Sequence, residues 1–307
     1  MRIRLQPWQL AVLVVALSGA AIGLVRWRHN AISYDARRML ATLPSERATL
    51  VFADVAALRK SGILDLLAGS RAAEEADYRK FVDQTGFDYR TDLDAVAAAF
   101  VNGASYFTIR GRFQWRQLAA YAISQGGECH YTICSLPGSS LERNISFYPL
   151  RTDVLALAVA SDTNGVNMIS PNQTVKLSPI PPEPVWVSAP SSAFAKVASL
   201  PAGVQSLLGP VAGADKITLA VGPQGPRAQL RLSVLCRSPE DAQAVLGELS
   251  AATEALRNAA PEAPRAGGQA DWAGLLRAGA FSRSGLEVTG AWPLERGFLE
   301  ALASGAP

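Results

Sequence analysis

The sequence predicts an α+β protein in which an N-terminal transmembrane helix precedes two tandem ferredoxin-like (split βαβ) units with antiparallel sheets. Three observations lead to this class. One long apolar run lies at the N-terminus, a Pro-rich stretch divides the rest of the chain, and the predicted order of strands and helices recurs on both sides of that stretch. The predicted parts are an anchor at 1–29, a first repeat at 30–169, a linker at 170–184 and a second repeat at 185–307.

The anchor is predicted from 21 consecutive uncharged residues, Leu5–Val25. A helix rises about 1.5 Å per residue, so about 20 apolar residues cross the ~30 Å hydrocarbon layer of a bilayer. Trp8 and Trp27 flank the run, at the level where lipid headgroups are expected. Two alternatives stay open, a buried soluble helix and a signal peptide cleaved near Ser18-Gly19-Ala20. The apolar run continues beyond that point, which favours a retained anchor.

The charge pattern bears on location and partners. The net charge of +3 comes from arginines that flank the apolar run, so it does not indicate a nucleic-acid partner. Counting positive charges alone favours a cytoplasmic body. The short head resembles a signal-anchor, however, and the cysteine pattern suits an oxidising compartment. We therefore expect a single-pass protein of the bacterial inner membrane with a periplasmic body, and an envelope protein as partner.

The first repeat shows a clear hairpin signal at Asn102-Gly103, because both residues tolerate positive φ. Strands at 95–101 and 105–110 flank this turn. The other predicted elements are a strand at Thr49–Val55, helices near 63–67, 72–82 and 113–123, and strands at 144–148 and 154–160.

The second repeat has the same predicted order. In the strand at Gln229–Cys236, apolar and polar side chains alternate with a period of two. The helix after Ser238 begins with Pro-Glu-Asp, where Ser can cap, Pro fits the first position and acids favour the N-terminus. The remaining predictions are strands at 184–188, 216–221 and 286–291, and helices at 191–197, 272–276 and 294–303. We interpret units 48–168 and 184–303 as a duplication, although such an order can also recur by chance.

Most common catalytic motifs are missing from the sequence. It contains no P-loop, dinucleotide fingerprint, esterase elbow, HExxH or SxxK pattern. It has two histidines, His29 and His130, and the lack of a third excludes a histidine-rich metal site. We expect no cofactor and no metal. This composition favours a non-enzymatic role.

An acidic segment offers the one candidate for a polar site. Residues 74–94 are rich in Asp and Glu, and Asp88, Asp92 and Asp94 are close enough in sequence to converge. Converging carboxylates can bind Ca²⁺ or Mg²⁺ or perform acid–base chemistry. Their spacing lacks the EF-hand pattern. The alternative is a solvated helix face with turn and cap residues.

The three cysteines predict one disulfide. Cys129 and Cys134 would lie about 16 Å apart in a straight strand, so a bridge requires His130–Ile133 to turn. Cys236 alternates with leucines on a core face and is expected to stay free and buried. Three reduced cysteines are the alternative.

Taken together, the basic head, the anchor, the run Asp83-Gln-Thr-Gly-Phe-Asp88, the cysteine hairpin and the duplicated body resemble bacterial exported or membrane-anchored proteins of unknown function. The resemblance implies no catalytic residues. The body also resembles, at the level of fold, bitopic scaffold subunits of secretion and pilus machines.

Two functions are compatible with this sequence. The first is a membrane-anchored extracytoplasmic binding or scaffold module. The second is a carboxylate-dependent hydrolase or small-ligand-binding protein of the cell envelope.

Overall fold

A computed structural model describes residues 34–64, 76–140, 142–171, 179–194, 209–224, 227–258, 272–295 and 297–298. The chain divides into two units, 1–35 and 36–307, and the second contains nearly all of the described residues. The predicted transmembrane run lies outside the described residues. Among the described helices, none is both long and apolar enough to cross a bilayer.

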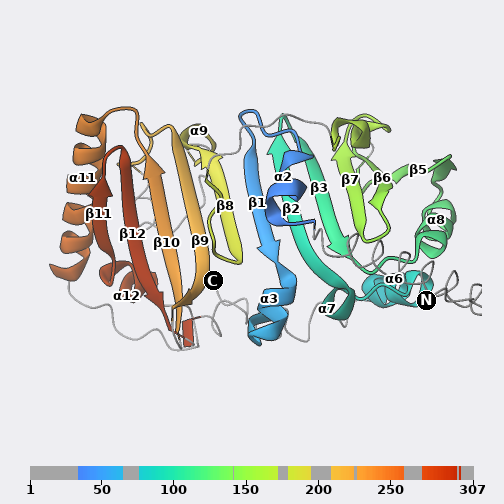
Figure 1. Ribbon diagram of the computed structural model, residues 1–307, viewed down its shortest axis with the longest axis horizontal. Coiled ribbons are helices and arrows are strands. Elements are labelled where there is room, and N and C mark those ends of the chain that lie inside the picture. Colours follow the sequence, from blue (N-terminus) through green and yellow to red (C-terminus); the bar gives the residue numbers. More distant parts are fainter. Residues whose placement is uncertain are drawn as a thin grey trace, which may run out of the picture. The chain divides into compact units, whose positions relative to one another are not determined.

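Within the described residues, one antiparallel sheet of twelve strands forms the centre of the second unit (Figure 1). The strands follow the order β11-β12-β10-β9-β8-β1-β2-β3-β7-β6-β5-β4. Their bounds are β1 Thr49–Asp54, β2 Leu93–Val101, β3 Ala104–Gly111, β4 Glu128–His130, β5 Ile133–Pro137, β6 Asn144–Arg151, β7 Val154–Ala160, β8 Val185–Pro190, β9 Lys216–Gln224, β10 Arg227–Leu235, β11 Ala280–Ser284 and β12 Glu287–Leu294.

The strand order differs from the predicted ferredoxin-like order. In a split βαβ unit, the third strand lies between the first and the second. Here β2 lies between β1 and β3, and β9 lies between β8 and β10. The reason is that β1 and β2 are antiparallel neighbours in the sheet. The connection between them therefore does not cross over another strand, as it does in a ferredoxin-like unit. The two halves have corresponding strand orders, which are β1-β2-β3-β7-β6 in the first half and β8-β9-β10-β12-β11 in the second. They join through the antiparallel pair β1–β8.

The helices divide between the two faces of the sheet. The described helices are α2 Ala36–Ala41, α3 Val55–Lys60, α6 Ala76–Thr85, α7 Tyr89–Asp92, α8 Trp115–Ser124, α9 Ser191–Phe194, α11 Pro239–Asn258 and α12 Trp272–Arg277, with a 3-10 helix, η1, at Gly165–Met168. On the face that bears Thr108 and Ser146, α2 packs on β2 and β3, and η1 packs on β6 and β7. Thr42 Oγ1 lies 2.7 Å from Thr108 Oγ1. Ser146 Oγ accepts a hydrogen bond from the Val166 N–H.

On the other face, helices cover the two ends. Leu118 and Ala122 of α8 pack with Phe147 and Leu155 at one end. At the other end, a larger core joins α11 and α12 to β9, β10 and β12. The strands between these ends receive a smaller cover, in which α3 contributes Val55 and Leu58. Among the described residues, the apolar sheet surface between the two helical ends is therefore covered less than the ends themselves.

Local sequence signals explain several boundaries. Asn102 and Gly103 have φ of 53° and 79°, as the predicted hairpin requires. Ser238 Oγ accepts a hydrogen bond from the Asp241 N–H, which caps α11. Strand β7 matches its predicted bounds. The predicted helix at 294–303 begins too early, because Leu294 still belongs to β12, and most of that segment lies outside the described residues.

Candidate binding face of the sheet

Strand register places two apolar rows on the face that carries the helical ends, here called the hollow face. Neighbouring strands contribute one residue each to the first row. The second row lies beside it, two residues away on every strand. The first row is Leu219, Val187, Val51, Ala98, Phe107 and Leu157, and the second is Val221, Val185, Ala53, Val96, Ile109 and Leu155. No polar side chain interrupts either row.

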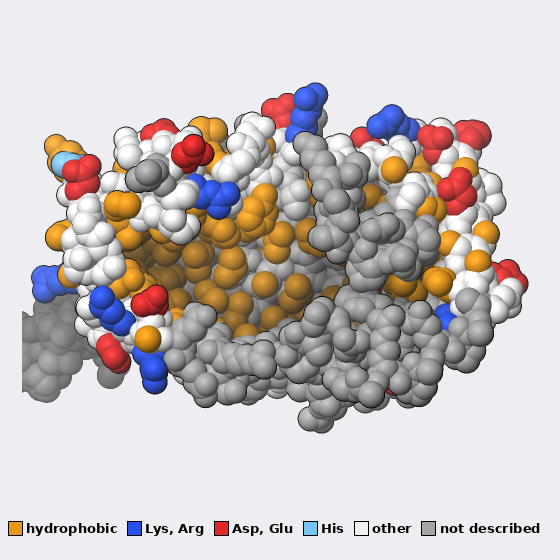
Figure 2. Space-filling model, turned by 180° about the vertical axis from the view of Figure 1, so that it is seen from behind, with side chains coloured by type: hydrophobic (Ala, Val, Ile, Leu, Met, Phe, Trp, Pro, Cys, Tyr) orange, Lys and Arg blue, Asp and Glu red, His pale blue; other side chains and the backbone are white. Residues whose placement is uncertain are grey.

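Hydrophobic side chains gather in a hollow on this face (Figure 2). Most residues of the two rows are only half-buried, and Phe100 on the same face is 42% exposed. The Phe100 ring meets the Phe107 ring edge to face, with 5.9 Å between ring centroids. Adjacent strands lie about 4.8 Å apart, so the rows from β9 to β7 span about 24 Å. The hollow is therefore a long apolar surface rather than a small pocket.

An aromatic cluster forms the helical end beside α8. The rings of Phe81 and Tyr121 lie edge to face at 5.1 Å, which joins α6 to α8. Phe87 and Phe113 stack at 5.0 Å, and Phe113 also contacts Trp115 at 5.3 Å. These contacts fix the helices against the sheet, so the boundary of the hollow is built from well-packed side chains.

The predicted acidic site forms caps and ion pairs in the structure. Asp88 caps α7, accepting hydrogen bonds from the Arg90 N–H at 2.8 Å and the Tyr78 hydroxyl at 2.8 Å. Asp92 accepts from the Asp88 N–H at 3.0 Å and from Arg112 at 2.8 and 3.0 Å. Asp94 lies 3.9 Å from Arg59. In the described part of the chain, no group of three or more His, Cys, Asp or Glu side chains is placed to hold a metal ion.

Two pKa shifts reflect this network. Burial, helped by the hydrogen bond to Asp88, raises the pKa of Tyr78 to about 12. For Asp92, burial alone raises the pKa, but hydrogen bonds from Asp88 and Arg112 and the charge of Arg112 outweigh it, so its pKa lies below the usual 3.8. The Asp92 carboxylate is thus held ionised as a structural acceptor.

We expect Asp92→Asn to lower the free energy of unfolding by about 1–2 kcal/mol at pH 7, because charge-assisted hydrogen bonds weaken. The folded pKa is depressed, so this stability is present above about pH 4 and disappears as pH falls through the folded value. Denaturant titrations at pH 7 and pH 3 measure the change. The control is Asp94→Asn, since Asp94 is 42% exposed and its pair with Arg59 is long. Equal losses in both variants would contradict the assignment.

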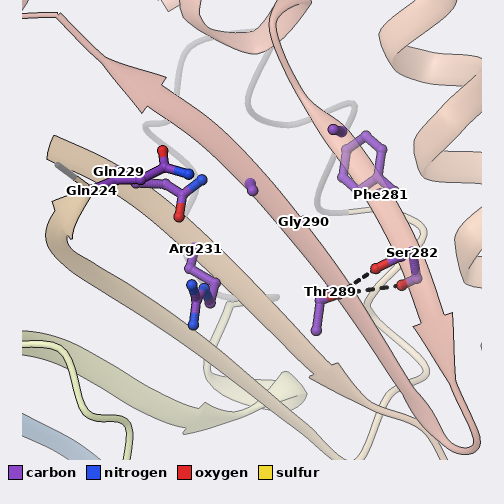
Figure 3. A pocket seen from close by; sticks show the side chains of 9 residues that line it. Gln224, Gln229, Arg231, Phe281, Ser282, Thr289 and Gly290 are labelled. Atoms are coloured by element: carbon purple, nitrogen blue, oxygen red, sulfur yellow. Dashed lines mark hydrogen bonds between the residues drawn. The ribbon is translucent and has the colours of Figure 1, made fainter. Parts of the chain in front are cut away.

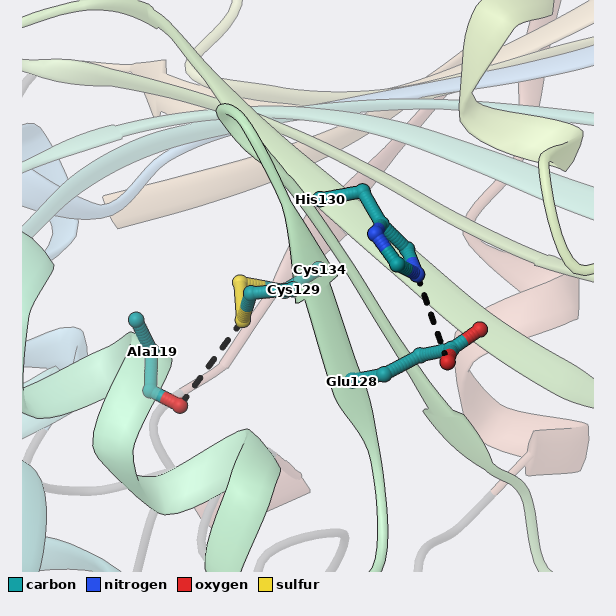
Figure 4. The surroundings of a disulfide bond; sticks show 5 residues. All are labelled: Ala119, Glu128, Cys129, His130 and Cys134. Atoms are coloured by element: carbon teal, nitrogen blue, oxygen red, sulfur yellow. Dashed lines mark hydrogen bonds and ion pairs between the residues drawn. A yellow bond between two sulfur atoms is a disulfide. The ribbon is translucent and has the colours of Figure 1, made fainter.

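The predicted disulfide is confirmed. Cys129 and Cys134 are bridged with Cα atoms 4.0 Å apart, and the chain turns at Tyr131-Thr132 between them (Figure 4). Cys236 is free and buried, as predicted, and burial raises the pKa of its thiol.

A pocket with polar side chains in its lining lies on the opposite face of the sheet, at β10, β12 and β11 (Figure 3). Its volume is about 490 Å³, and Ala280 and Ala291 contribute small side chains to its lining. The Arg231 guanidinium in this pocket is paired with Glu183 at 2.9 Å. Ser282 and Thr289 share a hydrogen bond of 2.8 Å. The charge of its arginine is therefore already neutralised within the chain.

The fold belongs to the class of α+β proteins built on one large antiparallel sheet. No protein-family model matches the sequence, and no curated protein matches it either. Among solved structures, crystal form III of TP0453 aligns with a TM-score of 0.50 at 13% identity, over 87% of this chain and 96% of that chain. Form IV of the same protein gives a TM-score of 0.48 over 87% and 95%. The comparison with form III shows a distant likeness of fold and no more.

Proposed function

We propose that the protein is a non-enzymatic, membrane-anchored extracytoplasmic binding module whose hollow face holds the acyl chain of a membrane lipid. The observation that carries this proposal is the pair of uninterrupted apolar rows between two helical ends. The expected anchor would keep the hollow near the bilayer, which is the source of such chains and raises their effective concentration.

The chemistry of the hollow favours an aliphatic occupant. The rows consist of Ala, Val, Leu, Ile and Phe, so they offer dispersion contacts but no hydrogen-bond donor or acceptor from a side chain. Each methylene group withdrawn from water contributes about 0.8 kcal/mol, so ten of them contribute about 8 kcal/mol. The span of about 24 Å is long enough for an extended acyl chain.

The alternative function, a carboxylate-dependent hydrolase, needs carboxylates that are free to exchange protons. Asp88 and Asp92 are instead committed to hydrogen bonds that cap a short helix and fix Arg112. This arrangement favours a binding role over acid–base catalysis.

The proposal is tested by titrating cis-parinaric acid, a fluorescent fatty acid, into the full chain held in cholate, a detergent without an alkyl chain. We expect saturable binding of one or a few molecules per chain, with displacement by palmitate. Fluorescence that rises without saturation, as for cholate alone, would overturn the proposal. Displacement by an amphipathic helical peptide but not by palmitate would also overturn it, because the occupant would then be a protein helix.

A further inference from the structure

The tip of the β4–β5 hairpin carries an unusual residue. Tyr131 is fully exposed, at 106% of its reference area, and no other large hydrophobic side chain in the described residues exceeds 58%. Its backbone also has φ of 55°. The left-handed region costs a residue with a Cβ about 1–2 kcal/mol, and a bulky aromatic side chain is rarely found there. Two unfavourable features therefore coincide at one residue.

Other two-residue turns of the same sheet avoid this cost. The β2–β3 turn uses Asn102-Gly103, and the β11–β12 turn places Gly285 at φ of 60°. Asn and Gly are the residues that this backbone favours. The β4–β5 turn has Tyr131-Thr132 at the corresponding place. Folding alone thus gives no reason for a tyrosine at this tip, and strain of this kind is typical of functional sites.

The base of the hairpin is held rigidly. The pair His130–Ile133 closes the turn, and the disulfide joins the next pair of the hairpin, Cys129 and Cys134. Gly127 approaches Ser135 so closely that a Cβ would lie 2.3 Å from the Ser135 carbonyl oxygen. Its N–H also donates to the Ala122 carbonyl at the end of α8. A rigid base lowers the entropy lost when the tip is bound by a partner.

Charge around the tip distinguishes between two kinds of partner. The His130 Nε2 atom lies 3.3 Å from a Glu128 carboxylate oxygen, on the side of the hairpin away from the disulfide (Figure 4). The described hairpin strands carry no Lys or Arg. An anionic membrane surface attracts clusters of Lys and Arg, which this tip lacks. Tyrosine is instead among the residues that most often anchor protein interfaces.

We propose that the Tyr131 tip is a preorganised anchor for a protein partner, which receives the phenol ring in an apolar pocket. This inference is independent of the acyl-chain site, because the tip lies on the edge hairpin and contributes to neither apolar row.

The test is photo-crosslinking in intact cells, with the full chain carrying p-benzoylphenylalanine at position 131. We expect a discrete protein adduct that falls at least tenfold when Cys129 and Cys134 are both replaced by Ser. The matched control places the same probe at position 123, an exposed site on α8, and should give none of this adduct. Absence of a protein adduct, labelling of lipid alone, or the same adduct from position 123 would overturn the proposal.

A stability measurement separates a contact role from a structural one. Tyr131→Gly relieves the left-handed backbone, so we expect the midpoint of thermal unfolding to rise by about 2–4 °C. We also expect this variant to compete at least tenfold less well than the unmodified chain for the position-131 adduct. A fall in the unfolding midpoint, or undiminished competition, would show that the tyrosine serves the fold and would overturn the proposal.

Discussion

Phe100→Asp is expected to weaken acyl-chain binding at least tenfold while leaving the fold intact. Phe100 lies on the hollow face against Phe107 and is 42% exposed, so the new carboxylate can stay hydrated in the empty protein. A bound acyl chain would withdraw that carboxylate from water, and an unpaired charge in an apolar site costs several kcal/mol. Each 1.4 kcal/mol is a factor of ten in affinity. Titration with cis-parinaric acid in cholate measures the change.

Leu235→Asp is the matched control for that variant. Leu235 is 37% exposed and belongs to the opposite face of β10, since it follows Val234 of the core. The same substitution there introduces the same charge at similar exposure, away from the apolar rows. We expect binding within twofold of the unchanged protein. Equal losses in both variants would mean that binding depends on net charge or general stability and would contradict the assignment of the hollow face.

Leu118→Ala is expected to lower the free energy of unfolding by about 3 kcal/mol. Leu118 is 8% exposed and packs in the cluster that joins α8 to Phe147 and Leu155. Removing a buried leucine side chain loses its transfer free energy and leaves a cavity. Chemical denaturation followed by circular dichroism measures the loss.

The control for this prediction lies on the same helix. Ile123 is 58% exposed, so Ile123→Ala should change the free energy of unfolding by less than about 0.5 kcal/mol. If Leu118→Ala were equally mild, α8 would not be fixed against the sheet and could not bound the hollow.

Local parts of this fold are predictable from sequence because their signals are local. Alternation along β10 reflects one buried face, and Asn102-Gly103 specifies a tight turn that the structure contains. The Cys129–Cys134 bridge is predictable because the two cysteines are close in sequence and a short turn between them brings them within bonding reach. In each case, residues close in sequence determine the geometry.

The long-range arrangement is not encoded in such patterns. The pairing of β1 with β8 joins residues more than 130 positions apart, and neither strand carries a signal that selects the other. The sequence does not reveal the hollow face for a related reason. Residues 95–100 of β2 read Ala-Val-Ala-Ala-Ala-Phe, which is apolar on both faces, so alternation does not reveal which face belongs to the hollow. The acidic residues are visible in the sequence, but their roles depend on Arg112 and Tyr78, which only the folded chain brings near.

The central claim is tested most directly by mapping where lipid chains touch the protein in cells. Cells that make the full chain are fed a photoactivatable fatty acid, irradiated, and the labelled residues are identified by mass spectrometry of the purified protein. The proposed function predicts labels on hollow-face residues of β2, β3 and β7, such as Val96, Phe107 and Leu157. Labels confined to residues 5–25, or to exposed opposite-face residues such as Leu235, would contradict it.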